Sequence, residues 1–276
     1  MATATVDDET RQSPALNRPL FGFDFENEHD LSSIVERVLG PQPADDRLPF
    51  VVTPNVDYIV RLREPGLADL AKALPRARYV LPDGQPIVWT SRLVKPSLKS
   101  RLPGSSMFPV VWKRVVADQR RALIVAANVE TAAQLRRELP DVGVVVPPHF
   151  DAADRRQLGE VVQDCLQVMD AVEPEFVFFG IGFPKQQRVA LALEEELRRT
   201  GRPMPVFLLL GGSFEMYLGT TRRAPGWMQR AGLEWFFRFL MEPKRLFRRY
   251  FVTDTRFALL FARELVAAKF AGLTKS

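Results

Sequence analysis

Short apolar runs alternate with helical stretches along most of this chain of 276 residues. Each run is long enough for one buried strand, and the segment after it carries apolar residues at every third or fourth position. We predict strands at 21–25, 49–52, 78–81, 122–127, 142–146, 176–180 and 206–210. Strands that alternate with helices are typical of an α/β fold, here a doubly wound, mostly parallel, Rossmann-like sheet with helices on both faces.

The alternation divides the chain into three regions. Residues 1–20 are polar and predict a disordered leader, and residues 21–221 form the predicted α/β catalytic domain. Beyond Thr221 the strands stop, and residues 222–276 predict a basic, aromatic, helical appendage. Apolar stripes of this kind most often pack on a core, but arginines beside aromatics also suit a membrane surface or a diphosphate.

Composition excludes several kinds of protein. The single cysteine rules out an intrachain disulfide, and two histidines with one cysteine disfavour a His/Cys metal site. Cys165 lies in an apolar helical pattern and is predicted to be buried. We find no run approaching roughly 18 apolar residues, so we predict no membrane-spanning helix. The net charge of +5 is concentrated near 222–256, which suits phosphate ligands or an anionic surface.

Small polar residues and glycines follow four of the predicted strands. They are Thr53 and Asn55, then Asp83, then Gly182 with Lys185 and Gln186, and finally Gly211 with Gly212 and Ser213. The carboxyl ends of parallel strands share one edge of a sheet, which is where α/β proteins bind ligands. Any one of these glycines could serve only a turn, and Asp83 could serve only as a helix cap, but the four exits together favour a binding site.

The same edge favours a bound diphosphate. Glycine turns before helices bring backbone N–H groups close to an anion. Neither a G-x-G-x-x-G fingerprint nor a Walker loop is present, and no Asp-x-Asp triplet follows a strand. Arg238, Arg245 and either Arg248 or Arg249 recur at helical spacing, although Pro243 lies between the first two. These arginines could supply the countercharge, but a solvated basic face would show the same pattern. His149 could be a base or a structural loop residue.

Taken together, these motifs resemble the WecG/TagA/CpsF glycosyltransferases, which form glycosyltransferase family 26. The similarity runs from about residue 21 to 252 in the family's order. The matching stretches are TPN at 53–55, PDG at 82–84, RLPG at 101–104, GIGFPKQ at 180–186, GGSF at 211–214, RAPGWMQ at 223–229, GLEW at 232–235 with Arg238, and EPKRLFRRY at 242–250.

The resemblance implies a metal-independent, inverting enzyme that needs no cofactor. It would move a sugar from a UDP-sugar to a polyprenyl-diphosphate-linked saccharide in surface polysaccharide biosynthesis, at the cytoplasmic membrane face. Asp83 matches the family's proposed base. The other residues that match the family's site are Thr53 and Asn55, Arg101, Gln186, and Arg238, Arg245 and Arg248 for the diphosphate. Gln187 stands where the family usually has Glu, Glu215 stands where it usually has Asp, and PPHF at 147–150 replaces a Gly-aromatic turn. These positions could line the sugar pocket, so the resemblance does not identify the donor sugar.

Two other readings remain open. A non-catalytic nucleotide-sugar-binding α/β protein would bind UDP without turnover. A nucleic-acid-binding protein would use the basic block, but the aromatics there follow a helical stripe rather than a stacking platform, so we expect no nucleic acid partner. A homo-oligomer is possible, and the sequence leaves the donor sugar and the linkage undetermined.

Overall fold

A single parallel sheet forms the centre of the molecule. The computed structural model describes residues 19–94, 97–221, 224–230, 234–241 and 256–273. Six strands lie in the order β2-β1-β6-β5-β3-β4, and each neighbouring pair is parallel. They are β1 (Leu48–Val52), β2 (Ala77–Val80), β3 (Ala122–Val125), β4 (Gly143–Val145), β5 (Phe176–Phe179) and β6 (Val206–Leu209). The predicted doubly wound α/β fold is confirmed.

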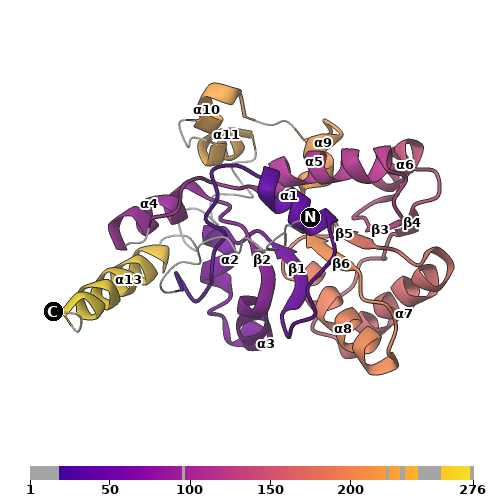
Figure 1. The fold of residues 1–276 in the computed structure, drawn as a ribbon, viewed down its shortest axis with the longest axis horizontal. Helices are drawn as coiled ribbons and strands as arrows, with labels where there is room; N and C mark the ends of the chain where they lie inside the picture. Colours follow the sequence, from indigo (N-terminus) through magenta and orange to yellow (C-terminus); the bar gives the residue numbers. More distant parts are fainter. Residues whose placement is uncertain (1–18, 95–96, 222–223, 231–233, 242–255, 274–276) are drawn as a thin grey trace, which may run out of the picture.

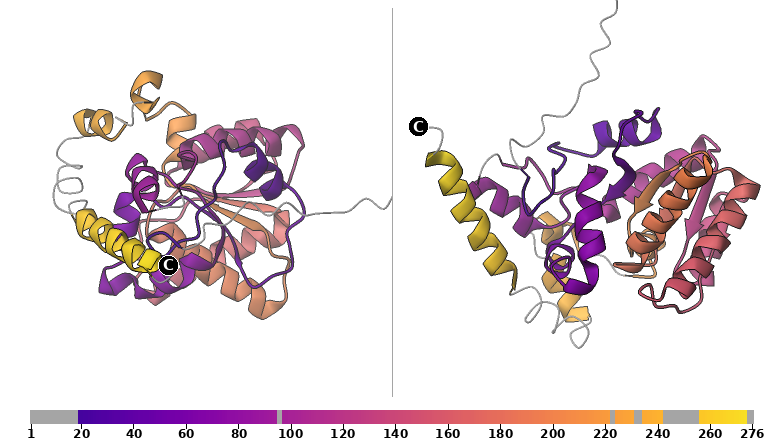
Figure 2. Two further views of the ribbon diagram at one scale, coloured as in Figure 1. Left: turned by 60° about the vertical axis from the view of Figure 1, so that its left-hand side comes forward. Right: turned by 90° about the horizontal axis from the view of Figure 1, so that it is seen from below.

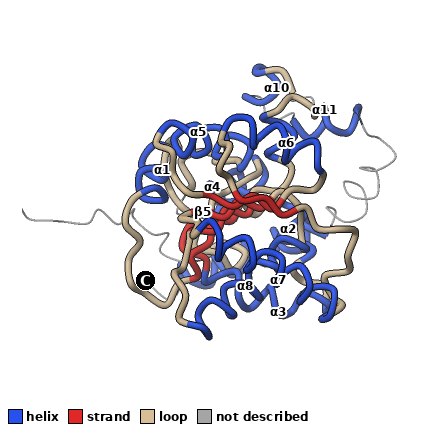
Figure 3. The backbone as a smooth tube through the Cα atoms, turned by 90° about the vertical axis from the view of Figure 1, so that its right-hand side faces the viewer, coloured by secondary structure: helices blue, strands red, loops and turns tan. Residues whose placement is uncertain are grey.

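Helices cover both faces of the sheet (Figure 1; Figure 3). One face packs against α1 (Ser32–Leu39), α5 (Gly104–Ala117), α6 (Val129–Glu138) and α9 (Ser213–Tyr217). The other packs against α2 (Val56–Arg61), α3 (Ala68–Ala73), α4 (Gln85–Val94), α7 (Arg155–Val172), α8 (Lys185–Thr200) and α13 (Arg256–Leu273). Two 3₁₀ turns, η1 (Pro65–Leu67) and η2 (Leu74–Arg76), flank α3, and α10 (Gly226–Arg230) and α11 (Glu234–Met241) follow α9.

The strands are apolar throughout because both of their faces are covered. In β1 all five residues are buried, with Phe50 and Val52 in the core on one face and Val51 in the core on the other. Successive side chains of a strand point to opposite faces, so one short run supplies two cores. Each fully buried large side chain contributes about 1.5–3 kcal/mol relative to exposure. Cys165 of α7 is buried in one of these cores, as predicted.

The prediction of a strand at 21–25 is wrong. Leu20 and Phe23 form only an isolated antiparallel bridge, closed by hydrogen bonds of 2.8 and 2.9 Å between their backbones. Phe21 and Gly22 take positive φ values of 54° and 88°, which reverse the chain in a tight turn. The alternation of apolar residues arises because Phe23 and Phe25 are buried against the core, and not because the segment pairs with the sheet.

Helix α13 packs beside this turn and lies within residues 222–276, for which the sequence predicts a helical appendage. The backbone N–H of Phe21 donates to Oε1 of Glu264 over 2.9 Å, and the rings of Phe21 and Phe257 lie 5.0 Å apart. Leu260 and Leu265 pack against the core, and α13 contacts α2 and α4 (Figure 2). The division at 1–20, 21–221 and 222–276 remains a prediction, and residues 1–18 lie outside the described residues.

Within the described residues, no helix has both the length and the apolar character that crossing a bilayer requires.

Candidate functional site

The exits of β1 and β2 are joined through their backbones. The N–H of Leu81 donates to the carbonyl of Val52 over 2.9 Å, and the N–H of Asp83 donates to the carbonyl of Pro54 over 3.0 Å. The parallel pairing thus continues past the end of both strands. It places Asp83, which is half-buried, beside the segment 53–55 that carries two of the predicted site residues.

A third segment joins the same edge from the loop before α5. The N–H of Leu102 donates to the carbonyl of Pro82 over 2.9 Å, so the half-buried Arg101 lies next to the Asp83 segment. A cation and a carboxylate from distant parts of the sequence are therefore brought to one place.

Gly104, at the start of α5, allows Thr53 and Ser213 to approach closely. A Cβ atom on Gly104 would lie 3.2 Å from Oγ1 of Thr53 and 3.3 Å from Oγ of Ser213. Such contacts are tight, so only glycine leaves both hydroxyls undisturbed. The exits of β1 and β6 and the start of α5 therefore meet at one point.

The β5 and β6 exits are joined by the side chain of Gln186. The side-chain Oε1 accepts the N–H of Gly211 over 3.1 Å, and the backbone N–H of Gln186 donates to the carbonyl of Gly182 over 3.0 Å. Gly182 and Gly211 have φ values of 76° and 57°, a region that strains other residues. Gln186 is buried, so it orders both turns and holds two of the predicted glycine segments together.

Three predicted site residues also have structural contacts. Oδ1 of Asn55 accepts the N–H of Tyr58 over 3.0 Å and caps α2. The Ser213 hydroxyl donates to the carbonyl of Leu210 over 2.7 Å. The ammonium group of Lys185 lies 4.8 Å from the ring centroid of Phe150, a cation–π contact. These contacts fix the side chains in place, and their roles toward a ligand stay predictions.

Four further predicted residues are placed differently. Gly212 lies between Gly211 and Ser213 and is exposed to solvent. Arg238 belongs to α11, for which the structure describes the backbone at this position. Arg245 and Arg248 lie outside the described residues. Their assignment to the diphosphate therefore remains a prediction from the sequence.

His149 is exposed on the loop after β4. None of the contacts described above that join the strand exits involves it.

Glu215 of α9, which stands where the family usually has Asp, is placed close to the segment 211–213. Its Oε2 is buried without a hydrogen-bond partner among the described residues, and it would lie 3.8 Å from a Cβ atom on Gly212. Burial raises the pKa of its carboxyl above the ordinary value. In the sequence, Glu215 is marked by its position directly after the GGSF segment and by its departure from the usual Asp.

Two cavities lie at the opposite, amino edge of the sheet. One has a volume of about 490 Å³ and is lined by Asp46, Leu48, Arg76, Glu194, Glu195, Arg198 and Arg199. The other has a volume of about 310 Å³ and includes Arg120 and Glu175. Each cavity contains an ion pair between lining residues, Glu194 with Arg198 in the first and Arg120 with Glu175 in the second. We place the candidate site at the carboxyl edge, where the polar residues that follow the strands converge.

In the part of the chain that the structure describes, no three His, Cys, Asp or Glu side chains are grouped so that they could hold a metal ion.

Comparison with known proteins adds a family and several relatives. A family model described as "Glycosyl transferase WecG/TagA/CpsF family" matches residues 18–271. The N-acetylglucosaminyldiphosphoundecaprenol N-acetyl-beta-D-mannosaminyltransferase of Bacillus subtilis (strain 168) is 26% identical over 181 residues, which are 64% of this chain and 66% of that protein. Proteins of the same name from Bacillus spizizenii and Staphylococcus aureus (strain MW2) are 25% and 26% identical, cover 83% of this chain in both cases, and are themselves covered to 84% and 86%.

Proposed function

Because the chain belongs to the WecG/TagA/CpsF family of glycosyltransferases, we propose that it transfers a sugar from a UDP-sugar to a polyprenyl-diphosphate-linked saccharide. The names of the relatives describe a transfer of N-acetylmannosamine to a diphosphoundecaprenol-linked N-acetylglucosamine, which supports a lipid-linked acceptor here. The observation that carries the proposal is the 3.0 Å bond from the Asp83 N–H to the Pro54 carbonyl, which places the candidate base beside Thr53.

In the proposed reaction Asp83 is the general base. The acceptor hydroxyl oxygen forms a bond to the anomeric carbon, and its proton passes to the Asp83 carboxylate. The bond from that carbon to the diphosphate oxygen breaks, and its electron pair leaves with UDP. A single in-line displacement of this kind inverts the anomeric configuration.

Arginines offset the charge that grows on the departing UDP. Arg101 lies beside Asp83 at the same edge of the sheet. Arg238, Arg245 and Arg248 are assigned to the diphosphate by their match to the family. Positive groups held in place before the reaction stabilise a developing anion without a metal ion, so we propose that the transfer is metal-independent.

The test offers the protein a panel of UDP-sugars, including UDP-N-acetylmannosamine, with polyprenyl-diphosphate-N-acetylglucosamine in detergent. We expect transfer from at least one donor, and we expect an excess of EDTA to leave the rate within about two-fold. Asp83→Asn should lower kcat by about 10²–10⁴-fold, the usual contribution of a general base. Asp46→Asn, an exposed acid at the amino edge, is the matched control and should leave kcat unchanged.

Two outcomes of these experiments would contradict the proposal. If Asp83→Asn folds normally and transfers sugar within a few-fold of the wild type, then Asp83 is not the base. If the wild type binds UDP-sugars and transfers none of them, the protein is a nucleotide-sugar-binding protein without this activity.

We also propose that the protein docks on the inner face of the cell membrane, where such an acceptor would be reached. Helix α4 begins two residues after Asp83 and exposes Trp89, Arg92 and Leu93 on its outer side. Helix α13 packs beside α4 and exposes Leu259 and Val266 (Figure 2). The exposed charged residues of α13 are Arg256, Arg263 and Lys269, and all of them are basic.

A face of this composition fits anionic lipid. Tryptophan and leucine enter the boundary between headgroups and acyl chains, and each nearby Lys or Arg adds about 1 kcal/mol of attraction to an anionic surface. The acid on α13, Glu264, is half-buried and accepts the N–H of Phe21, so it is turned toward the protein. Docking through this face would also turn the start of α4, and with it Asp83, toward the lipid-linked acceptor.

Vesicle sedimentation measures this docking. Trp89→Ser combined with Leu93→Ser should reduce binding to vesicles that contain phosphatidylglycerol by about ten-fold, from the lost apolar burial. Val110→Ser is the matched control, because Val110 is a similarly exposed apolar residue on α5, which covers the opposite face of the sheet. Equal binding by the double variant and the wild type would remove α4 from the docking surface.

A further inference from the structure

Arg101 is carried by a loop, residues 97–102, that runs beside the end of β2 and leads into α5. The side chains of Leu98 and Leu102 are buried, so both ends of the loop are anchored in the protein. The N–H of Leu102 also donates to the carbonyl of Pro82 over 2.9 Å. The middle of the loop, just before Arg101, needs contacts of its own.

Asn27 supplies one of these contacts. Its side-chain Oδ1 accepts the backbone N–H of Lys99 over 2.9 Å. The hydroxyl of the next loop residue, Ser100, donates to the carbonyl of Glu28 over 2.8 Å. Two successive loop residues are therefore bonded to two successive residues of the segment before α1, directly ahead of Arg101.

The segment that carries Asn27 is itself fixed to the fold. The N–H of Glu26 donates to the carbonyl of Val80, the last residue of β2, over 2.8 Å, and Phe25 is buried in the core. The carboxylate of Glu26 forms an ion pair with Arg37 of α1 at 2.7 Å. Asn27 thus follows two anchored residues, so its position is set by β2 and α1 rather than by the loop that it holds.

A fixed loop matters for the half-buried Arg101 because of the role proposed for its guanidinium. A positive group stabilises a developing anion most when it is in place before the reaction begins. The arginine side chain has about 2 kcal/mol of rotamer entropy, and a mobile backbone would add to that freedom. The hydrogen bonds at Ser100 and Leu102 hold the backbone on both sides of Arg101.

We propose that Asn27 is a positioning residue for the sugar transfer, which holds the loop 97–102 so that Arg101 stays beside Asp83. It acts through the loop and needs no contact with the substrate. The proposal rests on the function proposed above, because the role of Arg101 is taken from that reaction.

The test compares Asn27→Leu with Asn27→Asp. Leucine has a similar size but cannot accept the N–H of Lys99, whereas aspartate keeps an acceptor oxygen. We expect Asn27→Leu to lower kcat by about ten-fold with a smaller change in the donor KM, because the charge that Arg101 offsets grows only as the bond to UDP breaks. Asn27→Asp should keep kcat within about three-fold, since a carboxylate also accepts a backbone N–H.

Gln42→Leu is the matched control, because Gln42 also holds a loop through its side-chain amide, but at the amino edge of the sheet. Its Nε2 donates to the carbonyls of Arg37 and Gly40, each over 2.9 Å. This variant should lower the thermal midpoint at least as much as Asn27→Leu and leave kcat within about two-fold. If kcat falls in both leucine variants in proportion to the lost stability, Asn27 has only a structural role and the proposal is overturned.

Amide hydrogen exchange examines the same loop without any transfer. In Asn27→Leu the amides of Lys99 and Leu102 should exchange faster than in the wild type, and in Asn27→Asp they should stay protected. If the wild type transfers no sugar, the proposed function fails, yet exchange at Leu102 still decides whether Asn27 holds the loop. Unchanged exchange at Leu102 in Asn27→Leu would overturn the proposal.

Arg101→Ala separates a positioning role from a general loss of structure. If Asn27 acts through Arg101, Asn27→Leu should lower kcat by about ten-fold in the wild type and by less than about two-fold in Arg101→Ala. Equal losses in the two backgrounds would mean that Asn27 acts through other groups, which would also overturn the proposal.

Discussion

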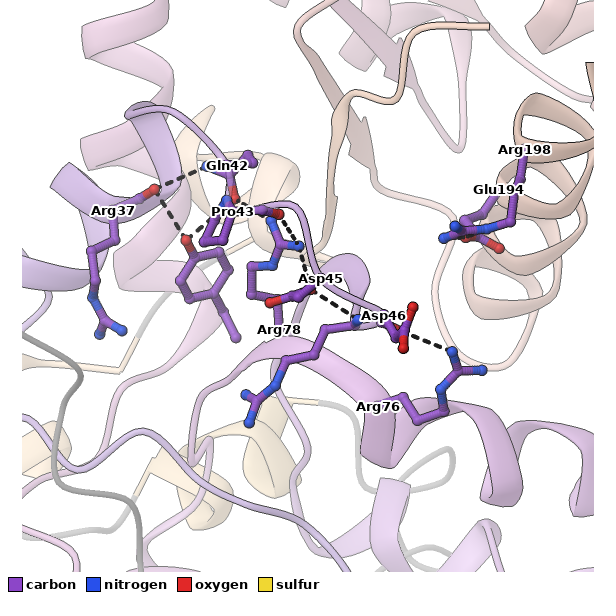
Figure 4. A network of polar contacts seen from close by, with 11 residues as sticks. Arg37, Gln42, Pro43, Asp45, Asp46, Arg76, Arg78, Glu194 and Arg198 are labelled. Carbon is purple, nitrogen blue, oxygen red and sulfur yellow. Dashed lines mark hydrogen bonds and ion pairs between the residues drawn. The ribbon is translucent and has the colours of Figure 1, made fainter. Parts of the chain in front are cut away.

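The two ends of the sheet are built from different contacts. At the amino edge, charged side chains pair with one another across segments (Figure 4). The guanidinium of Arg78 forms an ion pair with the carboxylate of Asp45 at 2.7 Å. The guanidinium of Arg76 donates to the backbone carbonyl of Asp46 over 2.8 Å. At the carboxyl edge, backbone hydrogen bonds and close approaches at glycines hold the loops together, as at Gly104 and Gly211.

This difference separates residues that stabilise the fold from residues that could take part in a reaction. Charges that are paired within the protein have little left to offer a ligand, even where they line a cavity. At the carboxyl edge, the backbone hydrogen bond from Asp83 to Pro54 fixes the position of the segment that carries the candidate base. Stability residues and candidate site residues therefore occupy opposite ends of the same strands, which is the usual division in parallel α/β proteins.

The largest effect that we expect from this comparison is at Gly104. Gly104→Ala would place a Cβ 3.2 Å from Oγ1 of Thr53 and 3.3 Å from Oγ of Ser213, so both hydroxyls must move by tenths of an ångström. We expect the rate of sugar transfer to fall by about ten-fold, because a small displacement of site residues strongly lowers a reaction rate. Steady-state kinetics measure the loss of transfer, and the thermal midpoint measures any loss of stability.

Gly159→Ala is the control for that substitution. Gly159 is exposed on α7 and a Cβ there meets no atom within 4 Å, so alanine should stabilise the protein by about 0.5–1 kcal/mol and leave transfer unchanged. Equal activity of Gly104→Ala and the wild type would mean that the close approach at the carboxyl edge has no role in the reaction.

At the amino edge we expect a loss of stability with no loss of rate. Arg198 pairs with Glu194, whose side chain is only 9% exposed, so Arg198→Ala leaves a mostly buried carboxylate without its partner. The free energy of unfolding should fall by about 1 kcal/mol in urea titrations. Arg199→Ala breaks a more exposed pair with Glu196 and should cost less. A clear fall in kcat for Arg198→Ala would contradict the separation of the two ends.

The smallest effect concerns Glu215 and depends on pH. Burial raises its pKa above the ordinary 4.5, so between those two values the folded protein binds more protons than the unfolded chain. Stability should therefore fall as pH rises through this range and stay lower above it. Glu215→Gln removes the penalty and should add about 0.5 kcal/mol at pH 7, with the gain lost near pH 4. A gain that is the same at both pH values would point to a cause other than ionisation.

Much of this architecture follows from local patterns in the sequence. Buried parallel strands are apolar on both faces, so a short continuous apolar run such as 206–210 predicts a strand. The carboxyl ends of parallel strands must share one edge of the sheet. The prediction of a strand at 21–25 was wrong because side chains on a tight turn can alternate between core and solvent just as they do on a strand. The apolar residues of α13 include exposed ones, Leu259 and Val266, which blur its helical stripe.

The site was predictable only where its residues leave a local signal. Asp83, Gln186 and the glycines follow strands, so their convergence could be expected from topology. The close approach of Thr53 and Ser213 to Gly104 left no such signal, because it exists only after the start of α5 packs between the ends of β1 and β6. Glu215 gave no signal of burial, since that depends on how α9 lies against the rest of the fold.

The strand order has a consequence for synthesis of the protein. β6 is the last strand in sequence, yet it lies between β1 and β5 near the middle of the sheet. A nascent chain on the ribosome can pair β1 with β2 and can join β3, β4 and β5, but these two parts of the sheet have no strand between them to pair with until residues 206–209 emerge. Until then both halves expose unpaired edges that could associate with other chains, so a slow or truncated translation product of this protein should be unusually dependent on chaperones.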